Sequence, residues 1–185
     1  MTTTVQSVDV AVPVSIAYNQ WTQFESFPHF MQGVERVDQI TDTKTHWHTS
    51  IGGVRREFEA EITEQHPDQR IAWQTVDGVH QAGVVTFHRL DDNTTRVTLQ
   101  MHYQPEGFAE TVGDLFGAIE RRIQGDLENF KKFIETRNTA TGSWRGEVPR
   151  EPQRDERTPV DPVRGADPRQ QPVDPTLGRV DQPPA

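Results

Sequence analysis

Two histidines on one expected strand are the first residues whose type and spacing could do chemistry. The segment HWHTS places His46 and His48 two positions apart, so both imidazoles would project from the same face of the strand. Such a pair can bind a metal ion, but alternation turns this face toward solvent and no third ligand is evident. We therefore expect no metal site and no bound cofactor.

Acid–base chemistry has one candidate histidine. His29 follows a proline in FESFPHFM, beside the expected mouth of a binding site. The sequence shows no grouping of nucleophile, base and orienting residue, and the absence of cysteine removes thiolate catalysis. We assign no catalytic residue.

Arg56 stands where the strand pattern turns a side chain toward the apolar face. A guanidinium there needs a partner, because an unpaired buried charge is strongly disfavoured. Two partners are open: Asp77 on a neighbouring strand, or an oxygen atom of a bound ligand.

The segments that must position these groups alternate between polar and apolar residues. SVDVAV, REFEAEIT and TRVTLQMHY each place apolar side chains on one face, which is typical of half-buried antiparallel strands. Turn signals separate the strands, at Gly52-Gly53 and in QHPDQ, VDGV and DDNT.

Helical patterns flank these strands. Pro13 indicates a helix start after the first strand, and a long helical pattern runs from about residue 108 to 137. The order is one strand, two short helices, six strands and one long helix. A sheet with one polar face must cover its apolar face with that helix. We therefore predict an α+β fold, in which a seven-stranded curved antiparallel sheet wraps on the long C-terminal helix.

Hairpin registers gather polar side chains at the end of the sheet where the long helix begins. A three-residue loop through Val79 aligns Thr75 with Gln81, and we favour it over a two-residue turn because it keeps Val85 and Phe87 inside. The other predicted pairs are Trp47 with Phe58, Thr49 with Arg56, Ile62 with Ile71, Ala60 with Trp73, and Arg56 with Asp77. These registers place Thr49, Arg56, Thr75, Gln81 and Tyr103 together on the inner face.

Aromatic residues recur every third position in the stretch YNQWTQFESFPHFM. We interpret Trp21 and Phe24 as core residues. Because the second strand begins at the polar end of the sheet, we interpret Phe27, Phe30 and Met31 as a collar at the mouth of a binding site.

Composition limits the partners. The 185 residues carry a net charge of −9, which disfavours nucleic-acid binding because phosphate contacts need clustered lysine and arginine. No run of about 18 apolar residues exists, and the N-terminus lacks a basic segment followed by an apolar one. We expect a cytoplasmic protein without integral membrane association.

The chain changes character at residue 139. Nine of the 13 prolines lie beyond that point, and large apolar side chains are rare there. Such a segment cannot bury enough surface to offset its chain entropy. We predict one domain over residues 1–138 and a disordered Pro-rich tail over 139–185, which is a spacer or carries a motif for a weak partner. Trp144 is the tail residue that we expect to touch the domain.

Several segments together resemble a known family. The resemblance covers about residues 5 to 137 and rests on VDVAVPVSIAYNQWTQFESFPHFMQGVERV, EITEQHPDQRIAWQT, GVVTFHRLDDNTTRVTL and the terminal helix. These resemble the polyketide cyclase/dehydrase branch of the START-like, helix-grip superfamily, which also includes coenzyme Q-binding START proteins. The resemblance implies a hydrophobic cavity between the sheet and the long helix.

Three functions follow as alternatives. The first is a carrier or sensor of a hydrophobic small molecule, such as a lipid, an isoprenoid or an aromatic polyketide-like compound. The second is an aromatase/cyclase-type enzyme, and the third is an interaction module without an open cavity. The expected ligand-binding residues are Phe27, Phe30, Met31, Trp47, Thr49, Arg56, Phe58, Trp73, Thr75, Gln81, Met101, Tyr103, Phe108 and Phe116.

Overall fold

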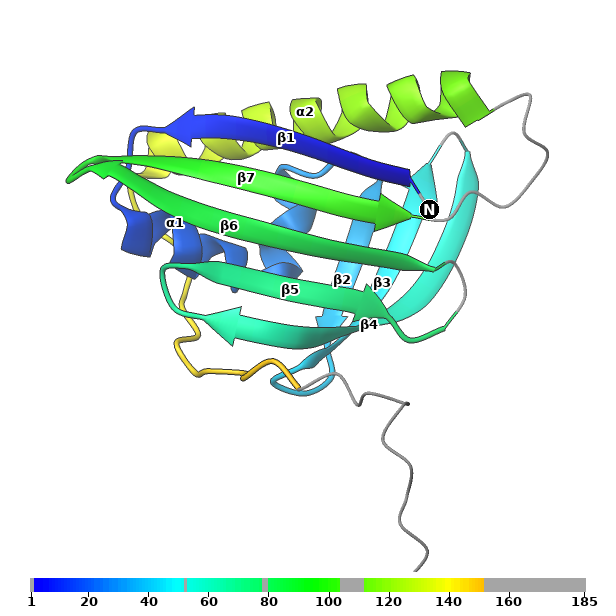
Figure 1. Ribbon diagram of the computed structural model, residues 1–185, viewed down its shortest axis with the longest axis horizontal. Helices are drawn as coiled ribbons and strands as arrows, with labels where there is room; N and C mark the ends of the chain where they lie inside the picture. Colours follow the sequence, from blue (N-terminus) through cyan, green and yellow to red (C-terminus); the bar gives the residue numbers. More distant parts are fainter. Residues whose placement is uncertain (1, 52, 78–79, 104–111, 152–185) are drawn as a thin grey trace, which may run out of the picture. The chain divides into compact units, whose positions relative to one another are not determined.

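The computed structural model describes residues 2–51, 53–77, 80–103 and 112–151 of the chain (Figure 1). Its elements are β1 (Thr2–Val10), α1 (Val14–Trp21), the 3₁₀ helix η1 (Phe24–His29), β2 (Val34–Gln39), β3 (Lys44–Ile51), β4 (Val54–His66), β5 (Arg70–Thr75), β6 (Gln81–Asp91), β7 (Thr94–Tyr103) and α2 (Val112–Arg137). The order of strands and helices is the predicted one.

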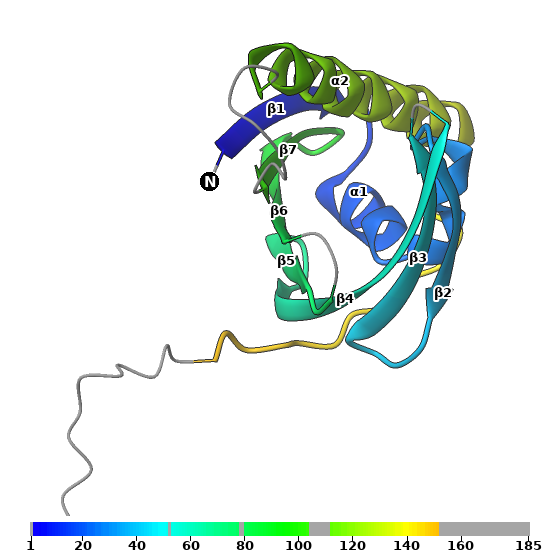
Figure 2. The ribbon, with the colours of Figure 1, turned by 90° about the vertical axis from the view of Figure 1, so that its right-hand side faces the viewer.

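One antiparallel sheet carries the fold. Its seven strands lie in the order β1-β7-β6-β5-β4-β3-β2, so α1 and η1 connect the two opposite edges. Figure 2 shows the sheet curling around α1, with α2 beside β1. The predicted α+β helix-grip architecture, a curved seven-stranded sheet with a long C-terminal helix, is confirmed.

The long helix α2 buries a stripe of apolar side chains against the sheet. Leu127, Phe130 and Ile134 are fully buried and Ile123 nearly so, and their spacing of three or four residues keeps them on one face of the helix. Neither α1 nor the described part of α2 is long and apolar enough to span a bilayer.

Most hairpin registers are as predicted. Trp47 pairs with Phe58 and Thr49 with Arg56, and the Thr75 hydroxyl exchanges hydrogen bonds with the backbone of Gln81. Phe87 pairs with Val97. Val85, two residues earlier on β6, is buried on the same inner face.

The register between β4 and β5 differs from the prediction. Ile62 faces Trp73 instead of Ile71, and Ala60 faces Thr75. Two features cause this: a tight turn at Asp68 (φ 61°) and a bulge in β4 between Ile62 and Glu64. The displacement amounts to two residues, so the same side chains still face inward. Its consequence falls on Arg56, which loses Asp77 as a partner.

The predicted collar at the mouth is wrong for two of its three members. Phe27 and Phe30 are each only 2% exposed and contact Trp21 with ring centroids 5.4 and 6.3 Å apart. Phe27 in η1 and Phe30, which follows the last residue of η1, are three residues apart, and both rings lie in the core. Met31 is half-buried at the edge of that core.

The predicted domain boundary at residue 138 is too early. Residues 139–151, which we call the strap, belong to the same compact unit as the sheet, which runs to Glu151. Val148 forms a two-hydrogen-bond bridge with Gln65, and Arg145 donates two hydrogen bonds to the Asp68 carboxylate. Trp144 is half-buried, and its backbone N–H donates to the Thr22 hydroxyl. The part of the predicted disordered tail from 152 to 185 lies outside the described residues.

Truncation of Phe27 or Phe30 tests the core assignment. We expect Phe27→Ala and Phe30→Ala each to lower the free energy of unfolding by about 3–5 kcal/mol, the loss typical of a buried phenylalanine. Urea unfolding measures it. Ile51→Ala, at a side chain that is half exposed, serves as the control and should cost far less. A loss below about 1 kcal/mol for both phenylalanines would return them to a surface collar.

Substitution of Arg145 tests the docking of the strap. The guanidinium pairs with Asp68 and lies 5.5 Å from the centroid of the Tyr18 ring. Since the pair is partly exposed, we expect Arg145→Met to lower the free energy of unfolding by about 0.5–1.5 kcal/mol. Arg150→Met removes an exposed charge of the same segment and should change it by less than about 0.5 kcal/mol. Equal effects in thermal unfolding would show that the strap does not stabilise the domain.

Candidate functional site

A polar row crosses the inner face of the sheet near the end where α2 begins. Gln81 pairs with Tyr103 on one side, and Thr75 lies on its other side within hydrogen-bonding distance of its backbone. Ala60 and Thr45 continue the row through β4 and β3. The predicted grouping of Thr75, Gln81 and Tyr103 is therefore confirmed at the level of strand register.

An apolar row lies directly beside the polar one. Trp73, Gly83 and Met101 are consecutive cross-strand partners on β5, β6 and β7. A Cβ atom on Gly83 would lie only 2.3 Å from Trp73 Cζ2 and 2.8 Å from Met101 Sδ. The indole ring therefore occupies the space that a side chain at Gly83 would fill, with the methionine sulfur next to it.

Two aromatic rings form the wall on β3 and β4. Trp47 and Phe58 are stacked nearly parallel, with centroids 6.0 Å apart and an interplanar angle of 6°. Trp47 Nε1 donates to the buried Thr45 hydroxyl at 2.8 Å, which fixes the orientation of the indole. Phe27 contacts the same indole edge to face, so the core continues into this wall.

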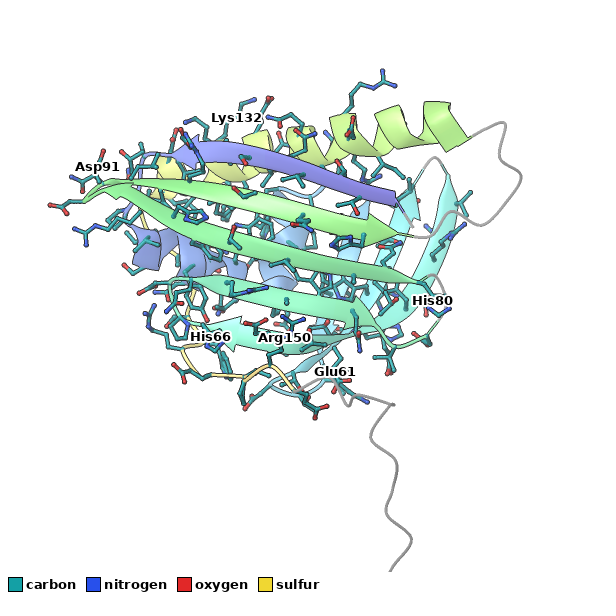
Figure 3. All side chains as sticks on the ribbon, viewed as in Figure 1. Glu61, His66, His80, Asp91, Lys132 and Arg150 are labelled. Carbon is teal, nitrogen blue, oxygen red and sulfur yellow. The ribbon has the colours of Figure 1, made fainter. Side chains whose placement is uncertain are left out.

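The two ends of the inner face differ in how completely they are filled. Around Phe87, Val97 and Leu127 the side chains are fully buried or nearly so, whereas Trp47, Phe58, Trp73 and Met101 stay half-buried. Ile51, Val54 and Val76, at the strand ends beyond them, are about half exposed. Figure 3 shows the two ends: His80 lies at the start of β6, and Asp91 at the far hairpin. The less filled end therefore carries partly exposed apolar side chains beside the polar row and at the strand ends.

The remaining predicted site residues lie in different surroundings. Thr49 is buried, and its hydroxyl donates to the Arg56 carbonyl at 3.2 Å. The Arg56 side chain is exposed and makes no ion pair with any described residue, while Asp77 accepts the N–H of Glu59. The predicted Arg56–Asp77 pair is thus wrong. Phe108 and the side chains of Tyr103 and Phe116 lie outside the described residues.

Met31 and His29 line a separate groove of about 620 Å³ between η1 and the C-terminal half of α2. The His29 imidazole stacks on Phe133, and the Arg137 guanidinium lies over the same ring. Beside the groove, burial raises the pKa of Asp126, opposed by the Gln32 N–H and by Arg122. Polar and apolar side chains both line this groove, and none of them comes from a strand of the sheet.

Gly83 is the inner-face residue that the sequence interpretation missed. A glycine inside a strand pattern marks a place where another group approaches the backbone closely, and that signal was present in AGVVTF. The favoured β5–β6 register, which aligns Thr75 with Gln81, already places Trp73 opposite Gly83.

Known proteins resemble this chain in sequence and in fold. A sequence profile described as polyketide cyclase/dehydrase and lipid transport matches residues 10–132. The chain belongs to this family. A relative from Streptomyces lincolnensis, an uncharacterized 17.2 kDa protein from the melC2–rnhH intergenic region, is 62% identical over 144 residues, covering 77% of this chain and 96% of its own.

Solved structures of other proteins have the same architecture. The Zhui aromatase/cyclase from a Streptomyces species superposes with a TM-score of 0.66 at 16% identity, over 77% of this chain and 99% of that one. A START superfamily protein from Mycobacterium smegmatis gives a TM-score of 0.61 at 13% identity, over 71% and 98%. These likenesses establish the START-like helix-grip fold.

Two glycine substitutions test the packing of the inner face. We expect Gly83→Ala to lower the free energy of unfolding by about 1–3 kcal/mol, because the new methyl group must displace Trp73 or Met101. The control is Gly125→Ala in α2, where a Cβ would meet nothing within 4 Å; it should raise stability by about 0.5–1 kcal/mol. Unfolding in urea measures both. A neutral Gly83→Ala would mean that the indole does not lie against this backbone.

Proposed function

We propose that this protein binds a hydrophobic small molecule between the sheet and α2, as a carrier or sensor of a lipid, an isoprenoid or an aromatic polyketide-like compound. One observation carries the proposal: the inner face is tightly filled at one end and only half-buried at the other. Trp47, Phe58, Trp73 and Met101 remain partly accessible there. Complete burial of such a side chain is worth about 1.5–3 kcal/mol, and a bound apolar ligand would supply the part of that gain that half-burial leaves out.

The polar row gives the proposed ligand an orientation. Thr75 and Gln81 stand beside the apolar row, so a ligand lying on Trp73 and Met101 would reach hydroxyl and amide groups with one end. Mostly apolar walls with a few polar groups are typical of small-molecule sites. Arg56 is exposed near the start of β4, and it remains a predicted partner for an acidic or carbonyl oxygen of the ligand.

Binding is preferred to catalysis for this chain. In the polar row, the described side chains are hydroxyl and amide groups, which orient a ligand but are weak proton shuttles at neutral pH. No feature of the described residues favours the aromatase/cyclase alternative, although three solved structures with this fold, Zhui, BexL and StfQ, carry that activity in their names.

A matched pair of tryptophan substitutions tests the site. Met101→Trp narrows the inner face, whereas His102→Trp places the same ring on the outer face of the same strand. The assay measures binding of an anilinonaphthalene sulfonate dye by its fluorescence, and displacement of the dye by farnesol. We expect Met101→Trp to weaken both at least tenfold, and His102→Trp to change them less than twofold.

Two outcomes would contradict the proposal. One is wild-type protein that binds neither dye nor farnesol; the other is an equal effect of the two substitutions. Thermal unfolding of both variants shows whether each is folded. Native mass spectrometry of protein from its own host then identifies any small molecule that co-purifies.

A further inference from the structure

The outer face of β2, β3 and β4 carries a cluster of metal-binding side chains. Cross-strand pairing puts Glu57 opposite His48 and Asp38 opposite His46, all on the face away from the core. Figure 2 shows these three strands side by side at one edge of the sheet. One ligand atom from each of His46, His48 and Glu57 lies within 4.8 Å of the others.

The Glu57 carboxylate faces both imidazoles. Its Oε1 atom is 3.4 Å from His48 Nδ1, and its Oε2 atom is 3.6 Å from His46 Nε2. Ligand atoms in a tetrahedral zinc site are about 3.3–3.6 Å apart, given bonds of about 2.0–2.2 Å. Small side-chain rotations would therefore bring all three atoms onto one ion, since the side chains are 27–66% exposed.

His48 also has a carboxylate on its second nitrogen. Nε2 lies 3.3 Å from Asp38 Oδ2, and Arg36 donates to the same carboxylate group. The hydrogen bond from Arg36 lowers the pKa of Asp38, so this group is an anionic acceptor. An imidazole that donates one N–H to a carboxylate and offers the other nitrogen to a metal is the common arrangement in metalloproteins.

The two nitrogens of His48 each face a carboxylate oxygen. If Nε2 donates its N–H to Asp38, the Nδ1 lone pair and the Glu57 oxygen point toward the same space, where one metal ion would take both atoms as ligands.

We propose that His46, His48 and Glu57 bind one divalent transition-metal ion on the outer face of the sheet, with Asp38 holding His48 in the binding orientation. Two imidazoles and one carboxylate favour Zn²⁺ over Ca²⁺ or Mg²⁺, which prefer oxygen ligands. Ni²⁺ or Cu²⁺ can bind the same ligand set in place of Zn²⁺. Three protein ligands leave a fourth position for water or another small ligand. This site is separate from the hydrophobic ligand site and does not rest on it.

The test is a Zn²⁺ titration of the full-length, tag-free protein at pH 7.5 by calorimetry. We expect one ion per chain, and at least tenfold weaker binding in His46→Gln, His48→Gln and Glu57→Gln. Asp38→Asn should weaken binding about tenfold, because it removes only the group that orients His48. His88→Gln removes an exposed histidine from the outer face of β6 and should change the affinity less than twofold.

A second measurement locates the ion. Substoichiometric Cu²⁺ should broaden the amide NMR signals of β2, β3 and β4 in the wild type and not in His46→Gln/His48→Gln. The proposal is overturned if no 1:1 binding occurs up to about 100 µM Zn²⁺, or if the double variant keeps the wild-type affinity. Broadening centred on another histidine would overturn it as well. If these side chains bind only protons, added Zn²⁺ gives no calorimetric signal, and the proposal is overturned too.

Discussion

The burial of one stripe of α2 against the curved sheet is the contact on which the rest of this structure depends. Ile123, Leu127, Phe130 and Ile134 come from three turns of one helix and are almost completely removed from solvent. At about 1.5–3 kcal/mol for each side chain, this stripe contributes as much as the whole net stability of a typical domain. The sheet must stay closed on this half of the helix, so an accessible site on the inner face has to lie at the other end.

That constraint was readable from the sequence because it is periodic. Alternation with period two and a long period-3.6 stripe specify which faces are buried, and neither depends on exact pairing. The same robustness explains why the two-residue error between β4 and β5 did not turn Ile71 and Trp73 away from the inner face. The Arg56–Asp77 pair was lost because it required the exact register, which the turn at Asp68 and the bulge after Ile62 altered.

Other features could not be predicted because they depend on tertiary packing. The spacing of Phe27 and Phe30 suits a collar or a core equally well, and only the place of η1 against Trp21 decides between them. The strap is polar and contains one proline, and it is held by Arg145, which contacts Asp68 and Tyr18, and by backbone hydrogen bonds of Trp144 and Val148. Composition alone places the boundary at 138, because an ion pair and a few backbone hydrogen bonds leave little trace in composition.

The tripeptide His46-Trp47-His48 shows how the pleat of one strand serves two faces. Trp47 lies in the aromatic wall of the proposed hydrophobic site, while its two neighbours form the proposed metal site on the other side. The third ligand, Glu57, was already fixed by the correctly predicted hairpin at Gly52-Gly53, since the register that pairs Trp47 with Phe58 must pair His48 with Glu57. Strand alternation turns both histidines outward, and the same alternation on β4 places Glu57 on the outer face beside them. A hairpin register is therefore as informative about contacts on the solvent face as about contacts in the core. The pairing that buries one residue also determines which polar groups meet outside.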